Sequence, residues 1–175
     1  MQAVDSIEYL AGDGTTSMKT ILAPWRIGYI LAPKGKGCFL CIKRTRGYQR
    51  RHFILRETEA CFVLLNKYPY SAAHVMVVPK RHVADLDCLS TDELLDFISV
   101  TRDAARVLKK AVAAQGVNLG ANLGRAAGAG LEEHFHFHIV PRWNGDHNFM
   151  PMLGATYVLP EYLEDTYTRL LPHFE

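Results

Sequence analysis

The apolar positions of the chain form short β-like runs on either side of one long helical pattern. Strands are predicted at residues 53–55, 60–65, 74–78, 117–123 and 134–140, where apolar residues cluster or alternate. The segment between the second and third runs contains Pro69 as a breaker, which favours adjacent antiparallel strands. The tail at 160–175 has the spacing of a short amphipathic helix.

The long helix carries the clearest local signals. Ser90-Thr91-Asp92-Glu93 is a capping box, in which Ser90 accepts from the amide three residues on and Glu93 reaches back. Apolar residues then recur at helical spacing, and Gly116 ends the run; these are Leu94, Ile98, Ala105, Leu108 and Val112. We expect a helix of about 25 residues with this stripe on the sheet. Strands, one long helix and further strands together predict an α+β fold.

Composition indicates one globular domain. The chain has 175 residues, of which 49% are apolar and 22% charged, enough for a sizeable core without disulfides. Residues 1–20 are expected to be an N-terminal arm and 21–175 the domain. A net charge of +2 does not favour a nucleic-acid partner. No signal peptide or membrane span is recognisable, so we expect a cytoplasmic protein.

Three histidines alternate with apolar residues in His134-Phe135-His136-Phe137-His138. On a strand, residues two apart share a face, so the histidines are expected to line one face and the phenylalanines the other. One metal ion held by all three would need ligands strung too far apart along the strand. Phosphate chemistry explains the set better, because a neutral imidazole nitrogen can attack phosphorus and neighbouring imidazoles can hold or donate protons.

A glycine-rich loop at 124–130 lies directly upstream of the histidines. Small residues let backbone amides approach phosphate oxygens, and Arg125 adds charge. A plain flexible loop is an equal alternative. The basic residues at 43–51 are more simply a solvated loop than a polyphosphate site. Trp143 is equally well placed to stack on a base or to pack.

The four cysteines divide into two kinds. Cys38 and Cys41 have the Cys-x-x-Cys spacing of half a tetrahedral zinc site. Cys61 and Cys88 have apolar neighbours and are expected to be small buried hydrophobes. His52 is a rival metal ligand by type, although an exposed residue in a basic run is the simpler reading.

The histidine run, with Pro141-Arg142 after it, resembles the histidine-triad (HIT) family. The stretch His74-Val-Met-Val-Val-Pro-Lys-Arg-His82 also resembles a strand of that family, with Ala73 in place of the usual glycine. The resemblance covers about residues 38–142 and implies a HIT-like antiparallel sheet with one long helix and a C-terminal helix. Segments at 23–26, 143–146 and 148–151 resemble the bacterial diadenosine tetraphosphate (Ap4A) phosphorylase-like members.

The resemblance implies a role for each matching residue. His136 is the nucleophile that attacks the α-phosphorus, and His138 lies near the phosphate and leaving group. It places Asn66 at the ribose and Asn122, with His138, near the phosphates. Gly128 and Gly130 of the loop and Trp143 are further nucleotide-binding candidates, named for their residue type and position. The loop is one residue longer than the common family pattern, so the residue that contacts the α-phosphate stays open. His74 is expected to be a structural histidine, and His147 and His173 surface residues.

In zinc-bearing relatives two histidines complete the cysteine pair, here His82 and His134. The resemblance therefore implies one structural zinc ion per chain, bound by Cys38, Cys41, His82 and His134. It also implies a homodimer that acts on adenine nucleotides or dinucleoside polyphosphates with inorganic phosphate, splitting Ap4A into ATP and ADP through an adenylyl-His136 intermediate. Hydrolysis of dinucleoside polyphosphates or AMP phosphoramidates is the main alternative. A non-catalytic nucleotide-binding protein is another.

Overall fold

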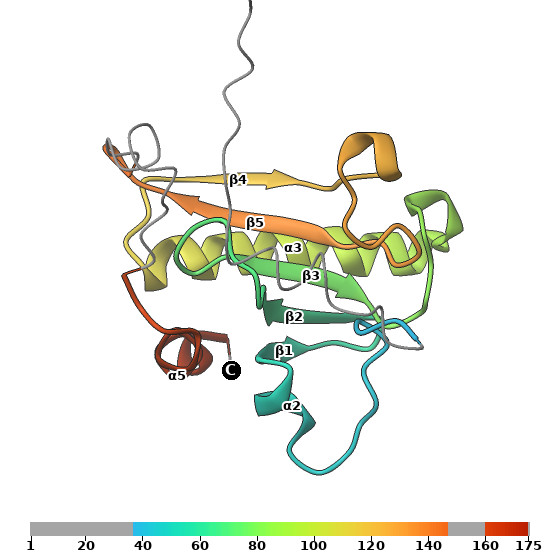
Figure 1. The fold of residues 1–175 in the computed structure, drawn as a ribbon, viewed down its shortest axis with the longest axis horizontal. Helices are drawn as coiled ribbons and strands as arrows, with labels where there is room; N and C mark the ends of the chain where they lie inside the picture. Colours follow the sequence, from blue (N-terminus) through green and yellow to red (C-terminus); the bar gives the residue numbers. More distant parts are fainter. Residues whose placement is uncertain (1–36, 147–159, 175) are drawn as a thin grey trace, which may run out of the picture.

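The computed structural model describes residues 37–146 and 160–174, so the predicted arm at 1–20, the motif at 23–26 and residues 147–151, with His147, lie outside it. The strands are β1 (Ile54–Glu57), β2 (Cys61–Leu65), β3 (Val75–Pro79), β4 (Gly116–Gly120) and β5 (Phe137–Arg142). They form one antiparallel sheet in the order β1-β2-β3-β5-β4 (Figure 1). The α+β prediction is therefore confirmed, with an antiparallel sheet.

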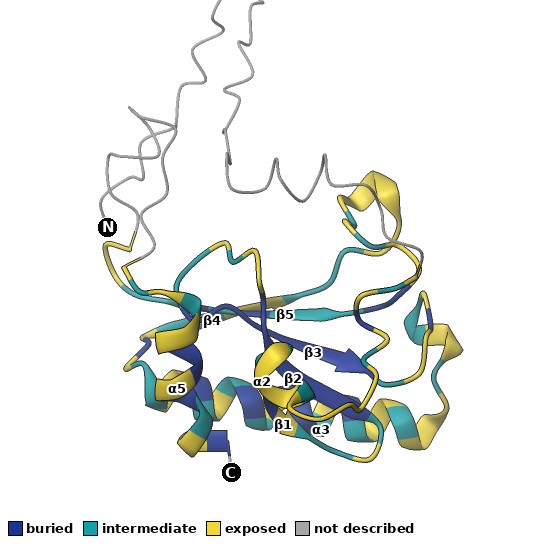
Figure 2. Ribbon diagram, turned by 60° about the horizontal axis from the view of Figure 1, so that its bottom comes forward, coloured by how far each residue is buried: buried dark blue, intermediate teal, exposed yellow. Residues whose placement is uncertain are grey.

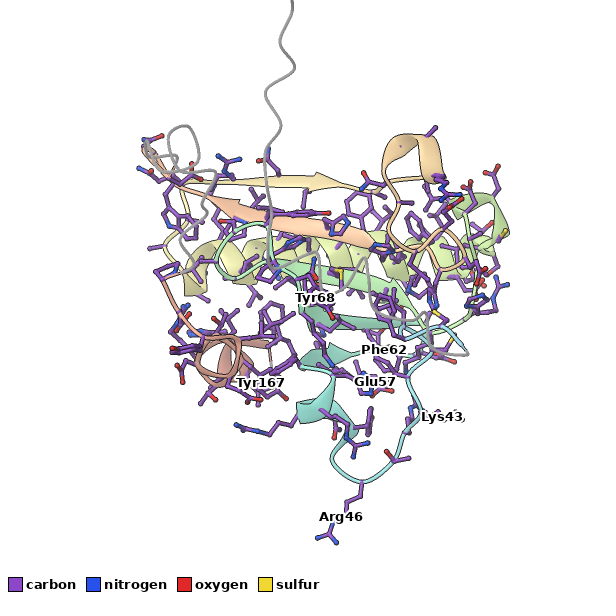
Figure 3. The ribbon with its side chains drawn as sticks, in the orientation of Figure 1. Lys43, Arg46, Glu57, Phe62, Tyr68 and Tyr167 are labelled. Atoms are coloured by element: carbon purple, nitrogen blue, oxygen red, sulfur yellow. The ribbon has the colours of Figure 1, made fainter. Side chains whose placement is uncertain are left out.

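Two main helices accompany the sheet: α3 (Thr91–Ala111) lies against one face, and α5 (Leu163–Phe174) packs on α3 and β1 (Figure 1). Tyr167 of α5 points at β1 and donates to the carbonyl oxygen of Ile54 at 3.2 Å (Figure 3). The short turns are α2 (Tyr48–Arg51), η1 (Leu86–Cys88) and η2 (Arg125–Ala127). Within the described residues, no helix is both long and apolar enough to span a bilayer.

The two central strands are buried on both faces. All residues of β2 and β3 are buried, and alternate residues belong to different clusters. Val63 and Val77 pack with Phe97 and Leu108 of α3, whereas Phe62 and its neighbours lie on the opposite face. The period of two in a strand thus divides the core into an α3 side and a far side.

The start of α3 follows the sequence prediction, but its buried stripe does not. The Ser90 hydroxyl accepts from the Glu93 amide at 3.3 Å, and the Glu93 carboxylate accepts from the Ser90 amide at 2.7 Å, so the capping box is confirmed. The predicted stripe is wrong in part, because Leu94 is 37% and Ile98 52% exposed. Buried and exposed stretches alternate along α3 (Figure 2), and the sheet contacts a side next to the predicted one. The buried residues of that side are Phe97, Val100, Thr101, Ala104 and Leu108.

A polar residue inside the true stripe explains that error. Thr101 is 5% exposed, and its hydroxyl donates to the carbonyl oxygen of Phe97 at 2.8 Å. A buried hydroxyl that finds such a partner avoids the desolvation cost of an unsatisfied group. The helix α3 therefore has two adjacent stripes that are largely apolar. Apolarity alone favours the exposed one with Leu94 and Ile98 over the buried one that includes Thr101.

The strand that carries the histidines begins later than predicted. The expected strand was 134–140, but β5 spans Phe137–Arg142. It pairs with β3 only as far as Ile139 and with β4 as far as Arg142. Since β4 alone pairs with β5 at Pro141, the missing amide hydrogen of the proline can face the unpaired side, and the strand continues through it.

One residue before β3 adopts an unusual backbone conformation. Ala73, at the family's usual glycine position, has a φ of 55° and is 4% exposed within the α3-side core. This left-handed region favours glycine, because a Cβ crowds the following carbonyl there. The turn formed by Ala73 delivers His74 to the edge of the site described next.

Candidate active site and metal cluster

The histidines after His134 lie on the far side of the sheet from α3. Phe135 and Ile139 belong to the α3-side core, and Phe137 packs against it, so His136 and His138 project the other way. Their ring centroids are 5.0 Å apart. The predicted division of the motif between two faces therefore holds for His136 and His138. His134 lies before β5, which includes only His138 of the three histidines.

The hydrogen bond of His136 fixes its tautomer. Its Nδ1 lies 2.9 Å from the backbone carbonyl oxygen of His134. A carbonyl oxygen can only accept, so Nδ1 carries the proton, and in the neutral ring Nε2 then keeps its lone pair. The ring is half-buried, which leaves one edge accessible. Nε2 therefore has the protonation state that a nucleophilic imidazole needs.

His138 is held in the opposite state by His74. The backbone amide of Tyr70 donates to Nδ1 of His74 at 3.1 Å, and the side-chain nitrogen of Asn66 lies 3.4 Å from the same atom. Neutral His74 must then carry its proton on Nε2, which lies 2.9 Å from Nδ1 of His138. His138 accepts there and is protonated on Nε2. The site thus pairs a lone pair on His136 with a donor on His138.

His74 is a buried, hydrogen-bonded histidine as expected, but sequence reasoning missed its contact with His138 of the site. It is 1% exposed, and its partner His138 is 64 residues further along the chain. The available signal was its register, because His74 precedes a strand that aligns antiparallel with the histidine strand. No local motif indicates that contact.

The predicted nucleotide-binding residues lie at two places beside the histidines. The buried side chain of Asn66 accepts from the Tyr68 amide at 2.9 Å, next to His74. On the other side, Gly120 pairs with His138, and Asn122 follows two residues later. The Asn122 amide donates to the carbonyl oxygen of Gly128 at 3.5 Å and so closes the glycine-rich loop. Gly128 has a φ of 84°, which accounts for glycine there, and Gly130 is exposed.

Trp143 lies apart from this group. It follows the end of β5 opposite His136, and its indole nitrogen donates to the carbonyl oxygen of Val112 at 3.1 Å. Of the two readings offered by the sequence, the described contact is the packing one. Nearby, the Arg142 guanidinium pairs with Asp146 at 2.6 and 2.8 Å and stabilises the turn after the strand.

Four side chains converge where the first histidine approaches the segment after β3. The ligand-capable atoms of Cys38, Cys41, His82 and His134 all lie within 4.8 Å of one another. Nδ1 of His134 is 3.2 Å and 3.6 Å from the two sulfurs, and Nδ1 of His82 is 3.3 Å from Cys41. A tetrahedral zinc ion, about 2.3 Å from sulfur and about 2.0 Å from nitrogen, separates its ligand atoms by about 3.5 Å. The donor set therefore fits a metal ion.

The surroundings of His134 also suit coordination. The ring is 0% exposed, and Nε2 donates to the carbonyl oxygen of Pro79 at 2.8 Å, which leaves Nδ1 for a metal. Burial lowers the pKa of His134, and neutral imidazole is the form that binds metal ions. His52 is not among the four clustered residues, so the structure gives no support to this rival ligand.

The remaining candidates are structural or exposed. Cys61 is buried as predicted, and burial raises the pKa of its thiol to about 12. The same expectation for Cys88 is wrong, because Cys88 lies exposed in η1. His173 is exposed, as expected. The basic segment before β1 is also exposed, with Arg46 at its tip (Figure 3), and its Arg44 pairs with Glu57.

Comparisons with known proteins agree with this geometry. A family model of the HIT domain matches residues 48–145. The chain is 45% identical over 118 residues to AP-4-A phosphorylase of Mycobacterium tuberculosis, which covers 67% of this chain and 60% of that relative. It is 34% identical over 94 residues to adenosine 5'-monophosphoramidase HNT1 of Candida albicans, covering 51% and 61%. The chain thus spans about three-fifths of the length of these relatives.

A solved structure of similar fold is the zinc-bound histidine triad family protein of Mycobacterium smegmatis. Its TM-score is 0.58 with 26% identity, over 70% of this chain and 84% of that one. The family model alone matches more than half of the chain and includes the histidine strand, both asparagines and the glycine-rich loop. The chain therefore belongs to the histidine-triad (HIT) family.

Proposed function

We propose that the protein is a nucleotidyltransferase that phosphorolyses dinucleoside polyphosphates, converting Ap4A and inorganic phosphate into ATP and ADP. The observation that carries the proposal is the pair of imidazoles with complementary outward nitrogens, a lone pair on His136 and a proton on His138. The 45% identity to AP-4-A phosphorylase supports this substrate class. Splitting one displacement into two through a covalent intermediate is the general advantage of such a nucleophile.

In the first step, Nε2 of His136 attacks the α-phosphorus of Ap4A. A nitrogen–phosphorus bond forms, and the bond from phosphorus to the bridging oxygen of the departing ATP breaks. His138 donates its Nε2 proton to that oxygen, which lowers the barrier to leaving-group departure. The carbonyl oxygen of His134 keeps its bond to the Nδ1 proton and stabilises the positive charge that develops on the His136 ring.

In the second step, an oxygen of inorganic phosphate attacks the same phosphorus. The nitrogen–phosphorus bond breaks, ADP leaves, and the lone pair returns to His136. His138, now lacking its Nε2 proton, accepts one from the attacking phosphate. Both residues thereby regain their starting states, and no proton is gained or lost by the protein over the cycle.

The two asparagines and the loop would hold the nucleotide during these steps. Asn66 is proposed to contact the ribose, and Asn122, with backbone amides around Gly128 and Gly130, the phosphates. Exposed glycine-rich backbone suits phosphate oxygens because no side chain blocks the amides. Trp143 is retained as a proposed base contact, although its described bond to Val112 favours packing.

We propose further that the four-residue cluster holds one zinc ion, in agreement with the zinc-bound relative. Two cysteines and two histidines fill a tetrahedral site, so no position remains for water and the ion would be structural. It would join the segment at 38–41 to the histidine run. The ion would supply no step of the phosphate chemistry.

We propose that two copies pair through α3 and the β4 edge. Leu119 of β4 pairs with the buried Ile139, so it faces the α3 side of the sheet, and it is 49% exposed. On α3, Leu95 and Ile98 are 66% and 52% exposed. An apolar surface of this kind is typical of an interface, and light scattering after gel filtration tests for a dimer. A cytoplasmic location and the absence of a nucleic-acid partner stay predictions from the sequence.

Hydrolysis is the second candidate, and the identity to a monophosphoramidase favours it. The first step would be unchanged, and water would replace phosphate as the acceptor in the second. AMP would then appear in place of ADP. The two functions therefore differ only in what reaches the intermediate.

Product analysis separates them. The purified protein is incubated with Ap4A, with and without phosphate labelled with phosphorus-32. Phosphorolysis is expected to need phosphate and to yield unlabelled ATP with labelled ADP. AMP formed at the same rate with or without phosphate would instead support the hydrolase. If Ap4A binds without being split, the non-catalytic reading gains.

A further inference from the structure

We propose that the cysteine–histidine cluster acts on the nucleophile, and that Cys38, Cys41 and His82 are positioning residues that set the tautomer of His136 through the backbone of His134. This inference rests on the proposed function, in which His136 attacks phosphorus. It goes beyond a purely structural metal site, because it assigns the cluster a measurable effect on the nucleophilic atom.

The first observation is that His134 takes part in both sites at once. Its side chain faces the two sulfurs through Nδ1 and bonds to Pro79 through Nε2. Its backbone carbonyl oxygen accepts the Nδ1 proton of His136 at 2.9 Å. Because both ring nitrogens of His134 are engaged, ring and backbone are held together, and the carbonyl has one defined direction.

The second observation is that the sheet does not hold this carbonyl. β5 begins at Phe137, and its first pairs are Val77 with Phe137 and Gly120 with His138. His134 therefore lies outside the ladder. By contrast, His138 has a paired strand on each side, with Met76 as its partner in β3. Within the described residues, the backbone at His134 depends on contacts other than strand pairing.

The third observation identifies what holds it instead. The amide of Phe135 donates to the carbonyl oxygen of Val83 at 2.6 Å. Val83 directly follows the cluster residue His82, so the segment 79–83 contacts the histidine run at three points, through Pro79, His82 and Val83. The segment with Cys38 and Cys41 closes the cluster from the other side. Coordination of His82 and His134 by one ion would lock these segments together.

The consequence for His136 follows from its single fixed hydrogen bond. With the carbonyl oxygen of His134 in place, the proton is held on Nδ1 and the lone pair stays on Nε2. If the cluster opens, the carbonyl is free to turn, and a neutral imidazole then distributes its proton between both nitrogens. Fewer molecules then have a nucleophilic Nε2, so kcat falls, whereas contacts that bind the nucleotide are retained.

The test uses the Cys41→Ala/His82→Ala double variant, which removes two of the four donor atoms. Both side chains are exposed, so their loss disturbs little packing. We expect zinc to be lost, kcat for Ap4A to fall by about 10- to 100-fold, and KM to change far less. In nitrogen-15 NMR spectra, the ring of His136 is expected to change from the Nδ1-protonated form to a mixture of tautomers.

Three controls complete the design. Cys88→Ser alters an exposed cysteine outside the cluster and should leave zinc content, kcat and the His136 signals unchanged. His82→Cys keeps four donors in a set that zinc accepts. It should therefore retain the zinc content, the kcat and the His136 signals of the wild type. Wild-type protein stripped of metal by a chelator should behave like the double variant and recover on addition of zinc, which removes dependence on any variant's folding.

Zinc loss that leaves the His136 tautomer unchanged would overturn the inference. Since this readout needs no catalysis, it is separate from a failure of the proposed function, which would appear as full turnover in His136→Ala.

Discussion

The two outer histidines of the motif, His134 and His138, are the same residue at equal spacing from His136, yet their surroundings differ completely. His134 is 0% exposed, lies before β5, and faces two sulfurs. His138 is half-buried, lies within β5, and bonds to another histidine. Each role is decided by a segment that arrives from elsewhere in the chain, 38–41 and 82 in one case and 66–74 in the other. Spacing predicts the face of a residue but not its partner.

The largest effect on turnover is expected at His136, which lies between His134 and His138 in the motif. His136→Ala should lower turnover by about a thousandfold or more, because no other group supplies the attacking lone pair. Nucleotide binding, measured by calorimetry, should persist. His173→Ala, at an exposed histidine on α5, serves as the matched control. Near-normal turnover in His136→Ala would show that His136 is not the nucleophile. The different roles of His134 and His138 could then not be explained by their positions on either side of it.

His134→Ala should have the next largest effect, on stability. Removing a buried ring leaves a cavity and an unpaired Pro79 carbonyl, so the free energy of unfolding should fall by about 3 kcal/mol or more, and zinc should be lost. Denaturant titration with elemental analysis measures both. His138→Ala is the matched variant at the other end, and because His138 is only half-buried it should lose less stability. Equal losses would remove the contrast.

His74→Ala tests the end of the motif at His138. The variant removes the Nε2 donor to Nδ1 of His138, which fixes the His138 proton on Nε2, so kcat should fall by about 10- to 100-fold, within the range of a general acid. The comparison substrate is the 4-nitrophenyl ester of AMP, whose leaving group needs no proton. If His74 acts through His138, the loss with this ester should be much smaller. The same loss with both substrates would show that His74 serves only to maintain the fold.

The smallest effect on stability is expected beside the cysteine–histidine cluster, at the residue before His82. There Arg81 donates to Glu93 at 2.8 and 2.7 Å. The Arg81 guanidinium, with the Ser90 amide, lowers the pKa of Glu93 from 4.5 to about 2. Since the folded pKa lies below the unfolded one, this contribution to stability is present above pH 4.5 and is lost as pH falls towards 2. Glu93→Gln should therefore flatten that part of the stability profile. An unchanged acid profile would contradict the pairing.

Much of the fold could be predicted because the signals were local. The capping box at Ser90 and Glu93 depends on four consecutive residues, and the alternation around His136 on five. The strands at 60–65 and 74–78 were found within one residue because fully buried runs stand out by apolarity alone. The four cluster residues that the family resemblance implied are also the four that the structure brings together.

What could not be predicted depends on distant partners. The start of β5 is set by where β3 and β4 supply pairing partners. The alternating pattern therefore extends back to His134, although His134 itself is not paired in the sheet. Cys88 is exposed because η1 turns it outward, despite an apolar neighbour. His74 acquires its role from a residue 64 positions away. In each case tertiary contacts override a local preference.

The backbone conformation of Ala73 limits which residues can replace it without loss of stability. Its left-handed backbone costs about 1 kcal/mol relative to glycine, while burial of its methyl group returns about 0.8 kcal/mol. Exchange between alanine and glycine is therefore close to neutral, and selection on stability alone would let either residue persist at the turn that introduces His74.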